Sequence, residues 1–294
     1  MSKFCVQCSE DIQEAAKFCP FCGANQETAL APQPDPLNSF LTGLLNKGAE
    51  ELGKFAADSL VEGLKSLQSL GKQYYFRTDS FPHDWIQEKS IEKCGITTIA
   101  GKGDEWVVVM TGKFANGDVY TSSADFPAAW IKEGWDKGYT VTGVSSNHSR
   151  WAVTMKRVFV STETYVLHQA FPTDWIQERW REGYRLDLVG AKDGLWVVFM
   201  QKRLSAPAEI YDITDDFPAY VIKKYWDQGY NISSLAHNQG NWVVVMKQLS
   251  SQRAERYERS EEFPKAWIQE KWTQGYYITN IASSDDEWVV VMQK

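Results

Sequence analysis

The residues of this chain whose types and spacing most directly indicate chemistry are four cysteines near the N-terminus. They form two pairs with the spacing CxxC, separated by ten residues: Cys5, Cys8, Cys19 and Cys22. Each pair can turn two thiolates toward one ion, and two such turns complete the tetrahedral thiolate site that suits zinc. In so short a segment, metal binding also supplies the free energy of folding. The spacing predicts one structural zinc ion with no open position for catalysis; disulfides or a redox-active pair are the alternatives.

This cysteine segment resembles the zinc ribbons, because the pattern CxxC followed by CPxCG is complete within residues 5–23. The resemblance implies a small metal-stabilised domain, which we assign to residues 1–26. Zinc ribbons bind nucleic acid in some proteins and protein partners in others. The net charge of the chain is −7 and no region is basic, which disfavours binding to a phosphate backbone. We therefore expect a protein partner.

Residues 27–72 predict a spacer followed by an amphipathic helix. Three prolines at alternate positions, Pro32, Pro34 and Pro36, favour an extended spacer. Leucines at helical spacing then give residues 38–70 a single apolar face, which needs a surface to cover it. Three interpretations stay open: packing on the rest of the chain, self-association into a homo-oligomer, and binding to a membrane surface. The last is disfavoured because the polar face of this helix is not rich in lysine.

Residues 73–294 contain five repeats, which recur every 45 or 46 residues. Each repeat contains a Phe-Pro pair, and the five phenylalanines are Phe81, Phe126, Phe171, Phe217 and Phe263. All thirteen tryptophans fall four, nine or twenty-five residues after one of these phenylalanines. The only variation in length lies between a recurring Met and the next recurring Tyr, which predicts a loop there.

Each repeat has the pattern of a strand, a helix and two further strands. Proline is tolerated at the start of a helix, and the Gly of a recurrent Gly-Tyr pair stands where a helix would end. The segment Trp-x-Val-x-Met is apolar at successive positions, as in residues 106–110, which predicts a strand buried on both faces. The recurring Tyr before each Phe-Pro predicts a third strand.

The repeats show no sign of polar end units. An open solenoid requires such caps, and without them the strands at Tyr75 and at Trp288–Met292 would be bare sheet edges. The predicted fold class is therefore α+β: a zinc ribbon, a helical linker, and five repeats in a closed pseudo-fivefold ring, either an α/β-propeller or a five-bladed propeller-like domain. The open solenoid is the alternative.

The repeat motif FPxxWIxxxWxxGYxIT followed by WVVVM resembles the C-terminal repeat region of plant casein-kinase-I-like kinases. This resemblance covers residues 73–294. The chain has neither a Gly-rich loop before a Val-Ala-x-Lys strand nor a His-Arg-Asp loop. The resemblance therefore implies an accessory, recognition-type domain and no kinase activity.

No catalytic residue is predicted in the repeats. Cys94 occupies the position of a recurring Tyr, so we expect a buried thiol rather than a nucleophile. None of the four histidines recurs: His83, His148, His168 and His237. An enzyme acting on guanidine groups through Cys94 is the alternative that this position disfavours. The recurring aromatic side chains are expected to fill the core, with stacking on sugars or bases as the alternative.

Recurrence marks structure here, so function is expected where the repeats differ. Two sets of segments vary: the loops between Met and Tyr, and the turns GKGDE, SNHSR, AKDGL, HNQGN and SSDDE before each central Trp. These features predict a non-enzymatic interaction module, a zinc-ribbon adaptor that binds a protein partner through variable loops. A binder of a small ligand or sugar is the alternative. The sequence predicts neither a signal peptide nor a transmembrane helix, and with reduced cysteines a cytoplasmic location is expected.

Overall fold

The structure is a computed structural model, and it describes seven stretches of the chain: residues 2–4, 11–13, 71–112, 117–157, 162–202, 207–248 and 253–294. The chain divides into two compact units, Met1–Leu64 and Lys65–Lys294. The four paired cysteines, the proline-rich spacer and the predicted helix at 38–70 lie outside the described residues. The predicted zinc site, helix and domain boundaries at 26 and 72 therefore stay predictions.

Two short strands near the N-terminus form an antiparallel pair. They are β1 (Ser2–Phe4) and β2 (Asp11–Gln13), with Phe4 opposite Asp11. The six residues that join them, 5–10, contain the first CxxC pair.

Each of the five repeats consists of a three-stranded antiparallel sheet and one helix, in the predicted order of strand, helix, strand, strand. Repeat 1 comprises β3 (Gln73–Thr78), α3 (His83–Ile91), β4 (Cys94–Lys102) and β5 (Glu105–Gly112). Repeat 2 comprises β6 (Val119–Ser123), α4 (Ala128–Asp136), β7 (Tyr139–Ser146) and β8 (Trp151–Arg157). Repeat 3 comprises β9 (Glu163–His168), α5 (Thr173–Arg181), β10 (Tyr184–Lys192) and β11 (Leu195–Lys202). Repeat 4 comprises β12 (Glu209–Thr214), α6 (Ala219–Trp226), β13 (Tyr230–Asn238) and β14 (Asn241–Gln248). Repeat 5 comprises β15 (Glu255–Ser260), α7 (Lys265–Thr273), β16 (Tyr277–Ser283) and β17 (Trp288–Gln293).

The recurrent Pro and Gly residues delimit the helices as predicted. Every helix begins directly after the Pro of its Phe-Pro pair. Four helices are followed by a Gly with a φ of 79° to 88°, a left-handed conformation that stops a helix at low steric cost: Gly138, Gly183, Gly229 and Gly275. Repeat 1 has Lys93 at this position, with a φ of 62°.

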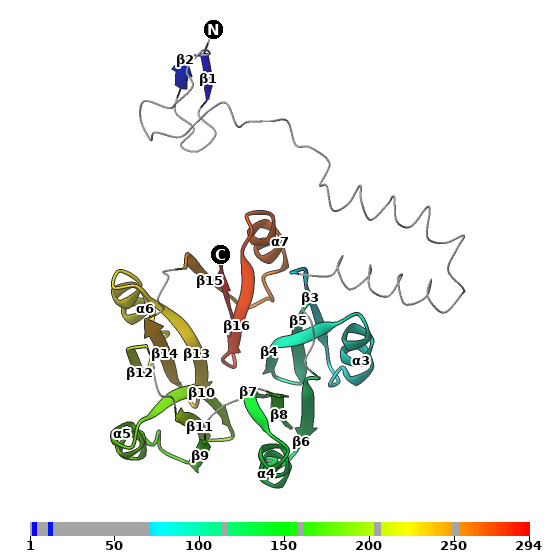
Figure 1. The fold of residues 1–294 in the computed structure, drawn as a ribbon, viewed down its shortest axis with the longest axis vertical. Coiled ribbons are helices and arrows are strands. Elements are labelled where there is room, and N and C mark those ends of the chain that lie inside the picture. The colour runs from blue at the N-terminus through cyan, green and yellow to red at the C-terminus, as the bar shows by residue number, and fades with distance from the viewer. Residues whose placement is uncertain are drawn as a thin grey trace, which may run out of the picture. The chain divides into compact units, whose positions relative to one another are not determined.

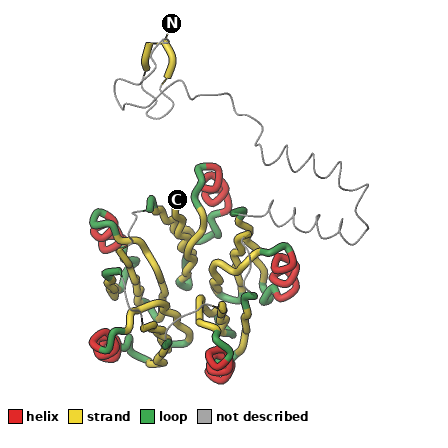
Figure 2. The backbone as a smooth tube through the Cα atoms, viewed as in Figure 1, coloured by secondary structure: helices red, strands yellow, loops and turns green. Residues whose placement is uncertain are grey.

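Within each sheet, the strand that precedes the helix lies on one side, the last strand lies in the centre, and the strand that follows the helix lies on the other side. We call these the outer, central and inner strands. Figure 1 shows the five inner strands, β4, β7, β10, β13 and β16, turned toward a common middle. The helices lie at the periphery, as Figure 2 shows by colour. The inner strands of successive repeats contact one another, and β16 of repeat 5 contacts β4 of repeat 1.

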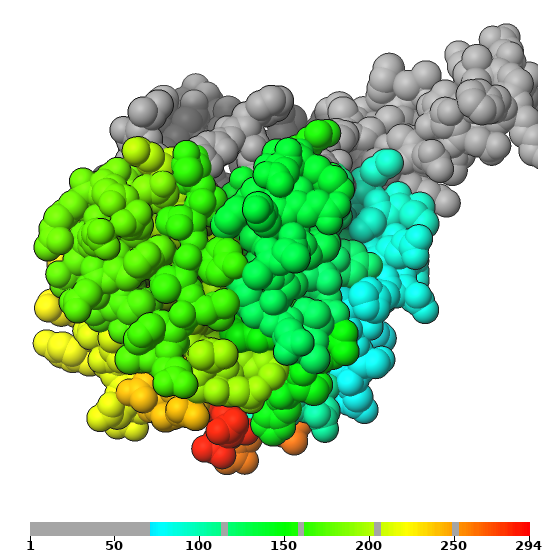
Figure 3. All heavy atoms as spheres, turned by 90° about the horizontal axis from the view of Figure 1, so that it is seen from below, coloured from blue at the N-terminus to red at the C-terminus, as the bar shows by residue number. Residues whose placement is uncertain are grey.

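The core extends across the junctions between repeats. In the central strand β5 five successive side chains, Trp106 to Met110, are almost fully buried, as predicted for a strand covered on both faces. Val107 and Val109 of this strand pack into one apolar cluster with Ile268 and Trp288 of repeat 5. In the space-filling view, neighbouring repeats abut along the side of the domain (Figure 3).

Among the described residues, no helix is both long and apolar enough to cross a membrane.

Candidate functional site: the cavity between the five turns

The turns that join each inner strand to its central strand come together around one cavity. This cavity, which we call the turn cavity, has a volume of about 270 Å³. All five repeats contribute to its wall, through residues 101–103, 146–148, 191–194, 237–239 and 283–285. A smaller hollow of about 60 Å³ shares one residue of each repeat with this wall and is lined mainly by the ends of the inner strands. The variable turns before the central Trp residues, one of the two sets of segments that differ between repeats, therefore form a single site.

Hydrogen bonds between neighbouring repeats fix the position of several turns. The hydroxyl of Ser146 donates to the carbonyl oxygen of Ala191, and the hydroxyl of Ser283 donates to the carbonyl oxygen of Gly101. Gly101 is needed because a Cβ there would lie 2.5 Å from the carbonyl oxygen of Ser146. The second of these bonds joins repeat 5 to repeat 1, so the wall of the cavity is bonded across the ends of the repeat array.

The titratable side chains at the cavity carry both signs of charge. His148 of repeat 2 and Asp285 of repeat 5, both largely exposed, approach each other at the cavity, with 4.0 Å between Nε2 and Oδ1. In the turn of repeat 3, Lys192 is ion-paired with the adjacent Asp193. Burial lowers the pKa of His237, although the nearby carboxylates, including Asp285, act in the opposite direction. Such a site suits a polar group that offers both donors and acceptors.

A second hollow of about 580 Å³ adjoins the turn cavity and shares His237, Ser284 and Asp285 with it. Its wall is rich in carboxylates: Asp215, Asp216, Glu261, Asp285, Asp286 and Glu287. Arg259 is the one Lys or Arg among the described residues that line it, and its guanidinium is 2.7 Å from Glu287. We call the surface formed by the five turns the turn face. The part of it around this second hollow is therefore acidic.

Cys94, considered above as a nucleophile, lies at the start of β4, whereas the turn cavity lies at the other end of that strand. Cys94 is 1% exposed in the core of repeat 1, as predicted, and burial raises the pKa of its thiol. The structure brings His148 and His237 to the turn cavity, whereas His83 packs on Phe81 and Tyr120 beside α3. Within the described ranges, no three His, Cys, Asp or Glu side chains are grouped as metal ligands would be.

A recurrent polar side chain that sequence reasoning missed joins each repeat to the one before it. It stands eight residues before each Phe-Pro, at the start of the outer strand: Gln73, Asp118, Glu163, Glu209 and Glu255. In all five cases its oxygen accepts the backbone N–H of a residue in the preceding inner strand: Ile278, Ile96, Val141, Leu186 and Ile232, respectively. Repeat 5 precedes repeat 1 in this scheme, since Gln73 accepts from Ile278 at 2.7 Å. We call these five side chains the junction acceptors.

A β-bulge in each inner strand makes this contact geometrically accessible. The pairing register of β16 with β17 shifts between Ile278 and Asn280, and the same shift recurs in all five sheets. A bulge disrupts the ladder locally and redirects the backbone. The N–H group just before the shift is the one that each junction acceptor binds.

Four junction acceptors also bind the indole N–H of the tryptophan nine residues after a Phe-Pro. The pairs are Trp135 with Glu163, Trp180 with Glu209, Trp226 with Glu255, and Trp272 with Gln73. Repeat 1 has Ser90 in place of this tryptophan. At the junction of repeats 1 and 2, the carboxylate of Asp118 lies 3.6 Å from the ammonium of Lys156 instead. The recurrence of an acidic or amide side chain at one position is a signal that could have revealed this set.

Three of the junction acceptors are carboxyl groups, one buried (Glu255) and two half-buried, whose pKa is raised by loss of contact with water. They are Glu163, Glu209 and Glu255, and the hydrogen bonds that they accept only partly offset the effect. A carboxyl whose pKa is higher in the folded than in the unfolded chain favours folding while it is protonated. That contribution is lost as the pH rises from the ordinary value of 4.5 through the folded pKa.

We therefore expect a pH-dependent stability difference between the wild type and the variant Glu163→Gln/Glu209→Gln/Glu255→Gln. The free energy of unfolding of the wild type should fall, relative to that of the variant, as the pH rises from about 4.5 toward 7. Urea unfolding of both proteins across this range measures the difference and cancels the groups that they share. A difference that is flat or rises with pH would contradict this assignment.

No curated protein matches this chain. One family model matches it three times in overlapping stretches, at residues 69–191, 158–253 and 189–294. Each match spans more than two repeats, and together they cover the whole described repeat region. The chain therefore belongs to the family described as a domain of unknown function (DUF7477).

Proposed function

We propose that this protein is a non-enzymatic interaction module that binds a protein partner through the face formed by its five turns. The observation that carries the proposal is the contrast between a uniform frame and a variable face. The central tryptophans and the junction acceptors repeat around the domain, while the turns at the cavity differ in sequence and charge. Loops held by a rigid scaffold are where binding residues concentrate.

We further propose that the five repeats form a closed pseudo-fivefold ring of propeller-like type. Support comes from the contacts between repeats 5 and 1. Gln73 accepts hydrogen bonds from Trp272 and from the backbone of Ile278, and its Nε2 donates to the carbonyl oxygen of Ile278 at 2.8 Å. Tyr75 packs on Phe263 with 5.2 Å between ring centroids. These contacts reproduce those of the internal junctions, as closure requires.

The charge of the turn face suggests the chemistry of the partner. The acidic hollow beside the turn cavity, with Asp215, Asp286 and Glu261 in its wall, complements basic side chains. We propose a protein partner with an exposed Lys- or Arg-bearing segment. A reducing compartment suits the paired cysteines, so we propose a cytoplasmic location. Self-association through residues 38–70 stays a prediction from the sequence.

The partner contact can be tested with the full-length chain. Amine-reactive cross-linking of the complex purified from source cells should join the partner to Lys102 or Lys192 of the turns. With the identified partner, the variant Asp285→Arg/Asp286→Arg should bind at least about tenfold more weakly, a loss of about 1.4 kcal/mol. The matched control reverses two charges on outer helices, Glu133→Arg/Glu270→Arg, and should bind as the wild type does. Wild-type affinity in the turn variant would refute the proposal.

We propose that the N-terminal segment holds one structural zinc ion through Cys5, Cys8, Cys19 and Cys22. The pairing of β1 with β2 supports this, because it makes the first CxxC part of a hairpin connection, where two thiolates can face one ion. Four thiolates would supply folding free energy to the segment and leave no site for chemistry.

The zinc proposal predicts equimolar zinc in the purified full-length protein. Cys19→Ser should lower the zinc content measured by elemental analysis to near zero, because three thiolates bind zinc much more weakly than four. Cys94→Ser is the matched control and should leave the zinc content unchanged. Zinc-free wild-type protein, or full occupancy in Cys19→Ser, is the result that would exclude the site.

A polar small molecule in the turn cavity is the second candidate function. The observation that favours it is the convergence of side chains of both charges, including Lys102, Lys192 and Asp285, with the polar His148, on about 270 Å³. Native mass spectrometry of the purified chain tests it. A bound small molecule that is lost in His148→Ala would favour this function over the protein partner.

A further inference from the structure

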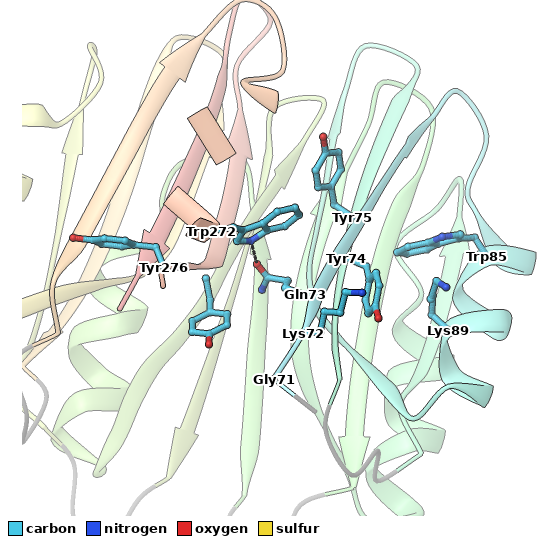
Figure 4. Close-up of a pocket in the computed structure, with 10 residues that line it drawn as sticks. Gly71, Lys72, Gln73, Tyr74, Tyr75, Trp85, Lys89, Trp272 and Tyr276 are labelled. Carbon is cyan, nitrogen blue, oxygen red and sulfur yellow. Dashed lines mark hydrogen bonds between the residues drawn. The ribbon is translucent and has the colours of Figure 1, made fainter. Parts of the chain in front are cut away.

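An aromatic groove of about 600 Å³ lies where repeat 5 meets repeat 1. Tyr74 and Trp85 line it from repeat 1, and Trp272 and Tyr276 line it from repeat 5 (Figure 4). Tyr277 of repeat 5 also belongs to its wall. Gln73 pairs with Thr111 at the end of β5 that is opposite to the turn at residues 103–104. The aromatic groove is therefore a surface separate from the turn face.

The charged groups that line the aromatic groove are all cationic. The lining contains the ammonium groups of Lys72 and Lys89 and no carboxylate, in a chain whose net charge is −7. Each ammonium nitrogen lies 5.1 Å from the centroid of the Tyr74 ring. Lys89 is ion-paired with Glu88 and Glu92. Lys72 has no carboxylate partner among the described residues, so a ligand carboxylate can complement it.

The polar groups of the aromatic groove argue against a sugar or a nucleic acid. Sugar hydroxyls need convergent amide or carboxylate groups, but both ends of the Gln73 amide are already bonded, to Trp272, Ile278 and Thr111. A nucleic acid needs several free cations along its backbone, whereas, within the described ranges, Lys72 is the one lysine of this groove without a carboxylate partner. The remaining donors are the Tyr hydroxyls and the indole N–H of Trp85.

We propose that the aromatic groove binds an extended, proline-rich segment of a protein partner that carries acidic residues. Polyproline II segments expose their backbone carbonyls and dock into grooves lined by aromatic side chains. The ring of Tyr277 and the face of Trp85 that is not stacked on Phe76 would receive the prolines. The indole N–H and the Tyr hydroxyls would donate to carbonyls, and Lys72 would meet an acidic side chain. Such a segment is already extended when free, so little conformational entropy is lost on binding.

The test titrates the full-length protein with a labelled peptide, Pro-Pro-Asp-Pro-Pro-Asp-Pro-Pro, and with a control peptide in which alanine replaces every proline. Fluorescence anisotropy should show saturable binding of the first peptide only. Tyr277→Ala, at a side chain that is 46% exposed, should weaken binding at least about tenfold. Tyr220→Ala, at an 81% exposed side chain on α6, is the matched control and should bind normally.

Charge exchange tests the role of Lys72 separately. Lys72→Glu should bind the aspartate peptide more weakly than the wild type does. The same variant should bind a peptide with lysine in place of aspartate more tightly than the wild type does. The turn variant Asp285→Arg/Asp286→Arg should bind the aspartate peptide as the wild type does, so failure of the turn-face proposal is distinguishable from failure here. The proposal is overturned if the wild type and Tyr277→Ala bind the proline-rich peptide equally. It is also overturned if the wild type binds that peptide and the alanine control peptide equally.

The proline-rich residues of this same chain are the competing occupant. If the wild type fails to bind the peptide and the variant Pro32→Ala/Pro34→Ala/Pro36→Ala binds it, the chain's own segment fills the groove and the partner proposal is wrong. If neither protein binds the peptide, the proposal is also wrong.

Discussion

Trp288→Ala should destabilise the repeat domain by about 3–5 kcal/mol, as expected for the loss of a buried large aromatic side chain. Trp288 is 1% exposed and lies edge-on to Phe263, with 5.5 Å between ring centroids. Its apolar cluster includes Ala100 and Val107 of repeat 1. The last repeat is thus packed on the first. Removing the Trp288 side chain should therefore lower the free energy of unfolding of the whole domain.

Trp196→Ala in the middle of the chain is the matched comparison. Trp196 is 4% exposed and lies edge-on to Phe171, and its cluster includes Val243 of the following repeat. Chemical denaturation should give similar losses for the two variants, each in one cooperative transition. A clearly milder loss for Trp288→Ala, with a separate early transition for repeat 5, would contradict the proposed closure and favour an open array.

Glu209→Ala should destabilise the domain by about 1–3 kcal/mol for each donor that it leaves without an acceptor. Glu209 accepts the indole N–H of Trp180 and the backbone N–H of Leu186 at 2.9 Å. Both donors belong to repeat 3, and Glu209 is the first residue of repeat 4. The substitution therefore acts on the junction between these two repeats. Thermal or urea unfolding of the variant measures the loss.

The chain supplies its own control for this prediction. Gln73 occupies the equivalent position at the junction of repeats 5 and 1 and accepts the same two kinds of donor. Glu209→Gln should therefore retain most of the stability that Glu209→Ala loses, because the amide oxygen can still accept both hydrogen bonds. Equal losses in the two variants would show that the hydrogen bonds do not account for the role of Glu209.

The amide at position 73 also has a physical rationale. The junction of repeats 5 and 1 has no short loop to join it, whereas at most six residues separate the central strand of each other repeat from the next outer strand. A buried carboxylate loses far more hydration free energy than a neutral amide does. Gln73 forms its hydrogen bonds to Ile278 and Trp272 without that cost. The neutral acceptor thus stands at the junction with the least covalent support.

The repeating elements were predictable because they depend on local sequence. Pro82 and its equivalents fix where the helices begin, Gly138 and its equivalents fix where they end, and the run Val107–Met110 specifies a strand buried on both faces. Cys94 was assigned to the core for the same reason, by its alignment with a recurring Tyr. These features need no knowledge of how the repeats are arranged.

The contacts between repeats were less predictable because they depend on that arrangement. The junction acceptors recur in the sequence, but their donors become accessible only through a bulge such as that at Ile278–Asn280, which strand alternation does not reveal. The turn cavity follows from the orientation of the five sheets, so the sequence indicated its variable turns but not their convergence. The aromatic groove requires side chains from both ends of the repeat array, such as Tyr74 and Tyr277.

Amide hydrogen exchange at Ile278 tests the proposed closure most directly. Its N–H is bound by Gln73, which lies 205 residues earlier in the chain. In full-length Gln73→Ala, exchange at Ile278 should accelerate strongly, while the amide of Val141, bound by Glu163 at an internal junction, should keep its wild-type rate. If the amide of Ile278 already exchanges fast in the wild type, and Gln73→Ala leaves its rate unchanged, the closure of repeat 5 on repeat 1 is contradicted.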